Sequence, residues 1–194
     1  MGTANPSLRG DTDDVLGRAR GDLTLPHQTL FTRLIRTDGG TAPTIGRLGL
    51  GLVMLPHALQ KAFGWFGGHG FTNTYHSFVN KMGIPAPLAF LAIVTEIVCT
   101  FLLIFGALTR IAAAGIVVVM LGAVLYVNAP NGFFMNWTGQ QQGEGFEYHL
   151  LAMALGLVLV LVGGGAGSVD RALMKRRPME GGSVDDRFVS PTTP

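Results

Sequence analysis

Charged residues are nearly absent from the middle of this chain, which limits the solvents in which it can fold. Between Leu48 and Val162 the sequence holds six Lys, Arg, Asp or Glu residues. Only 13% of all 194 residues are charged and 48% are hydrophobic, whereas about 25% of the residues in a soluble domain are charged. These proportions indicate a membrane protein rather than a soluble one.

Four apolar segments have roughly the length needed to cross a bilayer. A helix needs about 20 residues to cross a hydrocarbon core of about 30 Å. The apolar runs are continuous and lack the alternation that is typical of a membrane β-barrel. We therefore expect an all-α integral membrane protein, a four-helix bundle. The expected membrane-spanning segments are residues 44–63, 85–108, 111–129 and 146–162.

The distribution of arginine and lysine orients this expected bundle. These residues are frequent before residue 44 and after residue 165, and Arg110 lies in the short turn between the second and third segments. The other two loops and their edges contain only Lys61 and Lys81. Because cytoplasmic loops of membrane proteins are rich in Lys and Arg, we expect both termini to be cytoplasmic.

The regions around the apolar segments are expected to form tails and short helices. Residues 1–43 form a cytoplasmic arm, whose first part is expected to be disordered. Within the arm, "LFTRLIR" fits an amphipathic helix on the lipid surface or a linker helix packed on the bundle. Residues 44–165 form the membrane domain, with an interfacial amphipathic helix in the first outer loop. Residues 166–194 form a basic tail that starts with a short helix capped by Ser168.

Several classes of site find no support in the sequence. The basic residues are not interleaved with aromatic residues, so nucleic acid is not an expected partner. The single cysteine, Cys99, excludes an internal disulfide and a cysteine-ligated metal cluster, and we expect it to be a packing residue. The run Gly163-Gly164-Gly165 ends a helix and lacks the Lys-Ser/Thr of a phosphate loop. Arg47, alone at its end of the first segment, is expected to reach toward lipid headgroups.

Polar residues from all four segments reach similar depths in the outer half of the expected bundle. The helical rise of about 1.5 Å per residue places Glu96 near the midplane and His57 about 6 Å deeper than Lys61. An ionised carboxylate at the midplane costs a few kcal/mol, so Glu96 is expected to be protonated, paired or facing a wet cavity. Pro56 favours a kink beside His57. The candidate site residues are His57, Lys61, Glu96, Tyr126, Asn128, Glu147 and His149.

Each candidate also has a purely structural explanation. Lys61 fits an interfacial anchor, and Glu147 fits the edge of a loop. Tyr126 and Asn128 are residue types that commonly occur at the outer end of a membrane helix. His57 alone is typical of a hydrogen-bonded packing residue, whereas the intramembrane acid Glu96 indicates function. Only depth supports His57 and His149 as haem ligands or as part of a metal site. We therefore predict neither haem nor a metal.

The order and spacing of several short motifs resemble those of the DoxX family of small four-span membrane proteins. The resemblance covers roughly residues 44–175. The motifs are Arg47 with Gly49, His57 with Lys61, "GIPAP", Glu96, "GALTRIAA", Glu147 and "GGGAGSVDRAL". Ala58 departs from the family pattern, which often has glycine after the histidine, and the long N-terminal arm lies outside that pattern.

The resemblance implies a multi-pass protein of the bacterial cytoplasmic (inner) membrane. The related DoxD and DoxA subunits make up thiosulfate:quinone oxidoreductase, so it also implies a quinone-interacting subunit of a membrane oxidoreductase complex. In this interpretation quinone is the substrate and a partner subunit delivers the electrons. Glu96 and His57 carry protons, and the other five candidates bind the quinone.

Two other classes of function stay open at this point. One is a non-catalytic membrane anchor or assembly protein for soluble redox enzymes. The other is a transporter of small solutes or protons that uses Glu96. Small residues would also permit close contacts within the bundle or between copies in a homo-oligomer. These small residues are Gly46, Gly49, Gly156 and the run Ala112–Gly115.

Overall fold

Every regular element in the part of the chain that the structure describes is helical. The structure is a computed structural model, and it describes residues 30–176. The all-α expectation is confirmed for these residues. The expected disorder at the start of the arm and most of the basic tail lie outside them. The chain divides into the units Met1–Arg33 and Leu34–Pro194, and the short helix α2 (Leu30–Ile35) crosses their boundary.

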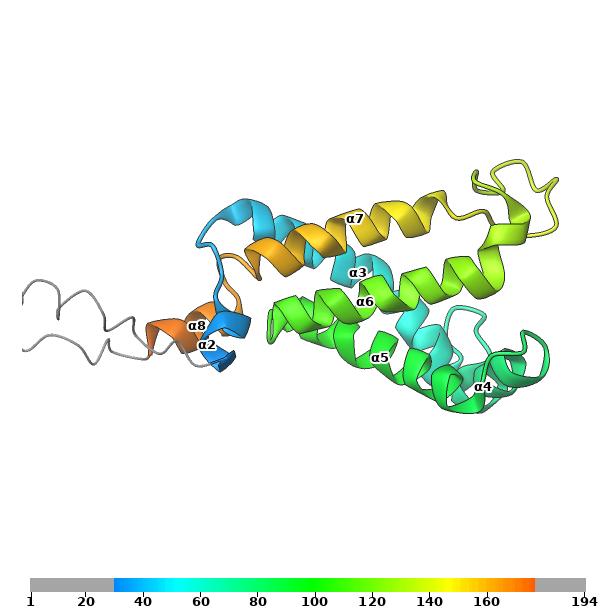
Figure 1. Cartoon of the computed structure of the whole chain (residues 1–194), viewed down its shortest axis with the longest axis horizontal. Helices are drawn as coiled ribbons and strands as arrows, with labels where there is room; N and C mark the ends of the chain where they lie inside the picture. Colours follow the sequence, from blue (N-terminus) through cyan, green and yellow to red (C-terminus); the bar gives the residue numbers. More distant parts are fainter. Residues whose placement is uncertain (1–29, 177–194) are drawn as a thin grey trace, which may run out of the picture. The chain divides into compact units, whose positions relative to one another are not determined.

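Four long helices occupy positions close to the four apolar segments (Figure 1). The helix α6 continues without a break into a π-helical segment, Val124–Asn128, and a 3₁₀ turn, Ala129–Asn131. Two shorter helices, α4 and α8, follow α3 and α7. The bounds are α3 Thr41–Phe63, α4 Gly70–Asn80, α5 Ala86–Phe105, α6 Thr109–Ala123, α7 Glu147–Val162 and α8 Val169–Lys175.

Among residues 30–176, two helices are long and apolar enough to cross a membrane by length and composition. They are α5 and the continuous helix Thr109–Asn131. The helix α7 is apolar but shorter, and α3 has 23 residues but contains Arg47, Pro56 and Lys61. The polar residues of α3 therefore need partners inside the protein if this helix is to sit in lipid.

Small residues allow the long helices to approach closely. The helix α5 contacts α3 and α6, and α7 contacts α6 and α3. A Cβ atom on Gly115 would lie 2.7 Å from Cys99 Sγ, and one on Gly156 would lie 2.7 Å from Val117 Cγ2. Cys99 is buried in this core, which confirms it as a packing residue. Gly49, by contrast, has no described atom within 4 Å of such a Cβ and does not serve a contact within the described chain.

Arg47 is buried at the end of the bundle where α3 begins, and the expectation that it reaches lipid headgroups is wrong. Its side chain is only 2% exposed. Nε donates to the Gly164 carbonyl at 3.0 Å, and Nη1 donates to the carbonyls of Leu103 and Ile104 at 2.6 Å each. The last carbonyls of a helix lack partners within it, so the guanidinium satisfies the end of α5 from inside the protein.

Asp170 of α8 completes this end of the bundle by capping α6. Its carboxylate is 2% exposed and accepts from the backbone N–H groups of Leu108 at 2.7 Å and Thr109 at 2.9 Å. Ser168 Oγ accepts from the Arg171 N–H at 3.2 Å, which confirms the expected cap of α8. The Gly163–Gly165 run ends α7, as expected. The motifs "GALTRIAA" and "GGGAGSVDRAL" therefore build one joint, which we call the Arg47–Asp170 joint.

Candidate functional site

A cavity of about 460 Å³ lies among the long helices, in the half of the bundle away from the Arg47–Asp170 joint. Its volume falls within the range of about 300–1,000 Å³ that is typical of small-molecule sites. The walls are mostly Leu, Val, Met, Ile and Ala side chains. The polar lining residues are His57, Lys61, Thr95, Glu96, Asn128, Tyr126, Glu144, Tyr148 and His149. The cavity therefore brings together every candidate except Glu147.

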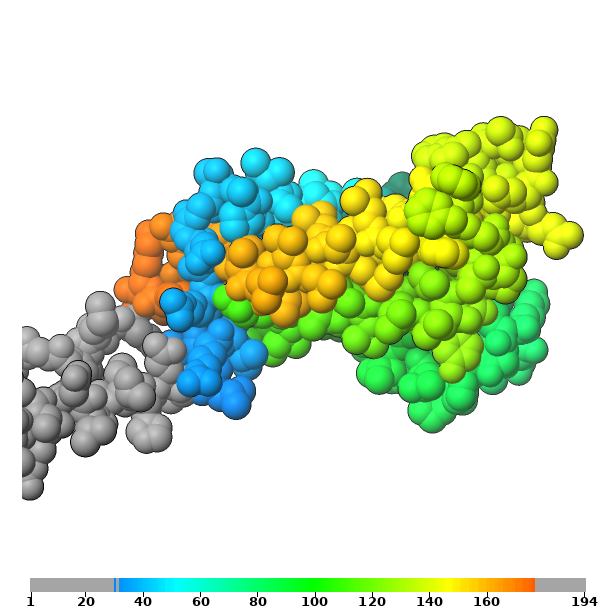
Figure 2. All heavy atoms as spheres, turned by 45° about the horizontal axis from the view of Figure 1, so that its top comes forward, coloured from blue at the N-terminus to red at the C-terminus, as the bar shows by residue number. Residues whose placement is uncertain are grey.

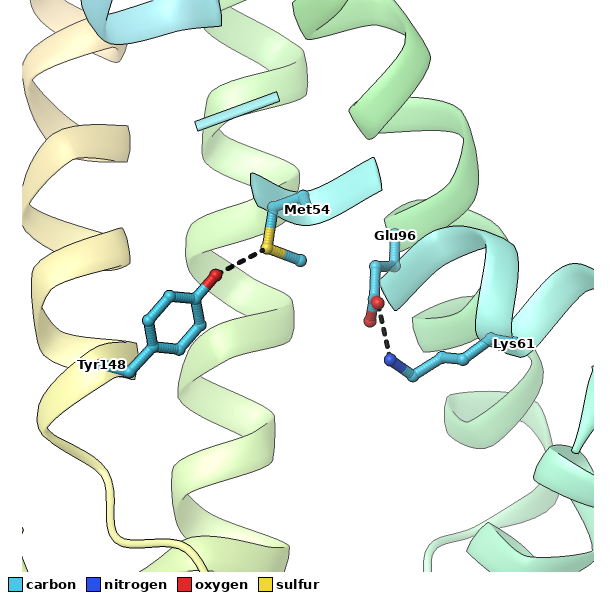
Figure 3. A network of polar contacts seen from close by, with 4 residues as sticks. All are labelled: Met54, Lys61, Glu96 and Tyr148. Carbon is cyan, nitrogen blue, oxygen red and sulfur yellow. Dashed lines mark hydrogen bonds and ion pairs between the residues drawn. The ribbon is translucent and has the colours of Figure 1, made fainter. Parts of the chain in front are cut away.

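Lys61 and Glu96 form an ion pair on the wall of this cavity. Lys61 Nζ lies 2.6 Å from Glu96 Oε1, and the two side chains are 23% and 4% exposed. Figure 3 shows the two side chains pointing toward each other from α3 and α5. The long apolar stem of lysine lets its ammonium group reach well below the depth of its own Cα atom. Glu96 thus has the partner that its position in an apolar helix requires.

Two histidines and a tyrosine lie beside the ion pair. The ring centroids of His57 and Tyr148 are 6.2 Å apart, and those of Tyr148 and His149 are 5.7 Å apart. Tyr148 Oη donates to Met54 Sδ at 3.6 Å (Figure 3). His149 Nδ1 is buried and has no hydrogen-bond partner among the described residues. Buried polar atoms are normally hydrogen-bonded, so this nitrogen is an exception within the described residues.

The end of α6 closes one side of the cavity with a change of helix type. Tyr126 and Asn128 belong to the π-helical segment, and both line the cavity. Asn128 Nδ2 donates to the Glu144 carbonyl at 2.9 Å, and Asn131 Nδ2 donates to the same oxygen at 3.0 Å. Asn128 therefore uses its amide donor to hold the loop after α6. Single turns of π-helix occur frequently at functional sites.

Glu147 lies apart from the other candidates. Its Oε2 accepts from the Met135 N–H at 3.3 Å, and its own N–H donates to the Phe133 carbonyl at 2.9 Å. Residues two apart on a helix point to different faces, so His149 lines the cavity while Glu147 faces the aromatic loop that includes Trp137. These contacts favour the structural explanation of Glu147 as the edge of a loop. In Figure 2 this loop forms the end of the bundle opposite α8.

The sequence analysis missed Tyr148, which lines the cavity and contacts Met54. A signal for it exists, because Tyr148 precedes the buried residues Ala152 and Gly156 by one and two turns on the same face of α7. The π-helical segment has no comparable signal. Among residues 30–176, no group of three or more His, Cys, Asp or Glu side chains could hold a metal ion.

Apolar helices around an ion pair and a cavity fit a helical membrane protein with an internal polar site. The chain belongs to the DoxX family: the model of that family matches residues 42–129. It is also 33% identical to the uncharacterized membrane protein Rv3486 of Mycobacterium tuberculosis over 158 residues, which cover 75% of this chain and 90% of the relative. No solved structure matches the chain. The family match begins in α3 and ends just after the π-helical segment, so it includes the ion pair.

Proposed function

We propose that α3, α5, the continuous helix Thr109–Asn131 and α7 all cross the bacterial cytoplasmic membrane, with both termini in the cytoplasm. The mutual contacts of these helices support four spans, because α3 can shield its polar residues against α5 and α7. The distribution of charge supports the orientation. The Arg47–Asp170 joint and the adjoining helix α8 gather Arg110, Arg171, Lys175 and Arg176, and positive charge favours the cytoplasmic side.

Within this membrane protein, we propose that the cavity binds the headgroup of a quinone for a membrane oxidoreductase complex. The observation that carries the proposal is the Lys61–Glu96 ion pair, which lines an apolar cavity together with His57 and His149. A quinone ring is apolar on its faces and accepts hydrogen bonds at two carbonyl oxygens. An apolar slot with a few convergent polar groups matches that chemistry.

The cavity residues suit the charge and proton changes of quinone reduction. Reduction to the quinol takes up two electrons and two protons, and in this proposal a partner subunit supplies the electrons. The Lys61 ammonium group would stabilise negative charge that develops on a reduced oxygen. His57 and Glu96 would relay the two protons from water to the reduced oxygens, since imidazole and carboxyl groups both exchange protons readily. The Glu96 carboxylate would first take up a proton and then pass it on. Tyr148, near His57, would help to position the ring.

The packing between the cavity and the Arg47–Asp170 joint favours binding over transport. Met54, Leu103, Ile116 and Leu159 are fully or almost fully buried in the core of the bundle. Interiors packed in this way contain few voids larger than a water molecule. The described residues therefore form a site closed toward the joint, which suits a bound headgroup better than a solute in transit.

Binding of radiolabelled decylubiquinone to the protein in lipid nanodiscs tests the proposal. We expect Glu96→Gln and His57→Ala each to weaken binding about tenfold or more, because the first removes the charge that pairs with Lys61 and the second removes the imidazole from the cavity wall. Glu147→Gln is the matched control, because Glu147 lies outside the cavity, and its affinity should stay within about threefold of the wild type.

Equal affinity of all these proteins for decylubiquinone would contradict the quinone proposal and favour an anchor role. Proton or solute flux in reconstituted vesicles that is lost in Glu96→Gln would favour transport instead. Each variant should retain the helical circular dichroism of the wild type, so that a loss of binding is not a loss of the fold.

A further inference from the structure

Exposed side chains on both α5 and α6 line the cavity and mark a gap between these two helices. We propose that this gap, which we call the α5–α6 gap, holds the apolar tail of an amphiphile whose polar head lies at the Lys61–Glu96 ion pair. The inference rests on the proposed function and adds to it a route of access and a ligand class. The ligand would be a lipid-soluble molecule with an isoprenoid or alkyl tail, which reaches the site from the bilayer.

Two glycines on the same side of α6 show where the helices part. Gly115 and Gly122 are seven residues apart, which is close to two turns of helix. A Cβ on Gly115 would lie 2.7 Å from Cys99 Sγ and 3.0 Å from Thr95 Cγ2, both on α5, whereas a Cβ on Gly122 would have no described atom within 4 Å. The two helices touch at the level of Gly115 and are separate at Gly122. Figure 1 shows α5 and α6 diverging from their common turn.

Side chains at the α5–α6 gap face both the cavity and the outside. Val118 of α6 is 67% exposed and Leu91 of α5 is 59% exposed, yet both line the cavity. A residue with both properties stands at the mouth of a cavity. Gly122 lies six residues before Asn128, the end of the π-helical segment, which corresponds to about 9 Å of helix. In the proposed orientation the mouth therefore opens at the depth of acyl chains.

On the side that would face the aqueous phase, apolar side chains and the exposed loop residue Glu144 line the cavity. Phe78 of α4, Ile84 and Met135 line it there, and the ring of Phe71 holds α4 against Phe90 of α5 at a centroid distance of 5.8 Å. Glu96 is thus only 3% exposed inside the cavity, whereas the apolar Val118 and Leu91 are exposed at the α5–α6 gap. This gradient fits an amphiphile that enters head first and leaves its tail in the α5–α6 gap, and it does not fit a hydrophilic solute.

A bulky residue at Gly122 tests this arrangement, and Gly49 offers a matched control. Both glycines are helical and have no described atom within 4 Å of an added Cβ, but only Gly122 lines the cavity. The probes are decylubiquinone and its tail-less headgroup, 2,3-dimethoxy-5-methyl-1,4-benzoquinone, with the full chain in lipid nanodiscs. We expect Gly122→Trp to weaken decylubiquinone binding about tenfold or more and headgroup binding by less than about threefold. Gly49→Trp should change neither affinity by more than about threefold.

Wild-type affinity of Gly122→Trp for decylubiquinone would overturn the proposed tail site. An equal loss of both probes would also overturn it, because the tryptophan would then fill the head site.

A nitroxide attached at Gly122→Cys gives a readout that does not depend on quinone. Its collision rate with dissolved oxygen should match that of a nitroxide at Gly49→Cys, and a low rate at position 122 would overturn an opening toward lipid. If the nitroxide at position 122 shows a high collision rate but the wild-type protein binds neither quinone probe, the proposed function is overturned and the opening toward lipid is not.

Discussion

At the scale of single residues, the charges of Lys61 and Glu96 explain each other's presence in apolar helices. Either side chain alone would place a charge in an apolar helix, which is expensive in lipid. Paired at 2.6 Å, the two charges compensate each other on the wall of the cavity. The need for a partner could be predicted from the position of Glu96. The identity of that partner could not be predicted, because the backbone of Lys61 lies nearer the expected membrane interface than Glu96 does.

Removing one member of this pair should destabilise the protein more than removing both. Lys61→Met leaves an unpaired buried carboxylate and should cost about 3 kcal/mol, whereas Lys61→Met with Glu96→Gln should cost far less. Thermal unfolding in detergent, followed by circular dichroism, measures the difference. If the double variant is as unstable as the sum of the single variants, the two residues do not act as a pair.

The contrast between His149 and Glu147 shows how far sequence could predict the site. The helical rise gives depth, so the candidates from four segments could be placed at one level, and all but Glu147 line the cavity. Depth does not give direction. The rotation of α7 places Tyr148 and His149 on the cavity and turns Glu147 toward the loop, and that rotation depends on packing against α6.

At the scale of elements, helix ends explain motifs that look like surface features in the sequence. The long helices lie close to the four apolar segments, because continuous hydrophobicity reports directly on burial or lipid contact. Sequence could not show that α8 returns Asp170 to the start of α6, nor that Arg47 satisfies the end of α5. Both contacts join residues far apart in the chain, and hydropathy carries no information on such contacts.

The Arg47–Asp170 joint should govern stability rather than binding. Arg47→Lys cannot serve three carbonyls in fixed directions, and Asp170→Asn removes the charge that caps α6. Each change should lower the free energy of unfolding by about 2–3 kcal/mol. The folded fraction should still bind decylubiquinone within about threefold of the wild type.

Arg176→Lys, at the exposed end of α8, is the matched control and should leave the unfolding temperature unchanged. Thermal unfolding and binding on the same preparations separate the two effects. If Arg47→Lys unfolds at the wild-type temperature but loses affinity, the joint has a role in the site that its contacts do not explain.

At the scale of the whole molecule, the orientation in the membrane can be tested with cysteines. The native Cys99 is buried, so single cysteines at exposed positions report the side on which they lie. A membrane-impermeant maleimide should label Gln141→Cys in intact cells and should label Lys175→Cys only after permeabilisation. This result follows from the positive charge around the Arg47–Asp170 joint. Labelling of Lys175→Cys in intact cells would reverse the proposed orientation.

The central claim, that the cavity holds a quinone, is tested most directly by what the protein carries from its own membrane. The protein is purified in mild detergent and extracted into organic solvent, and the extract is analysed by ultraviolet absorption and mass spectrometry. We predict about one quinone per chain in the wild type and a loss of most of it in Glu96→Gln. Phospholipid without quinone in the wild-type extract, at the level of a control membrane protein, would contradict the claim.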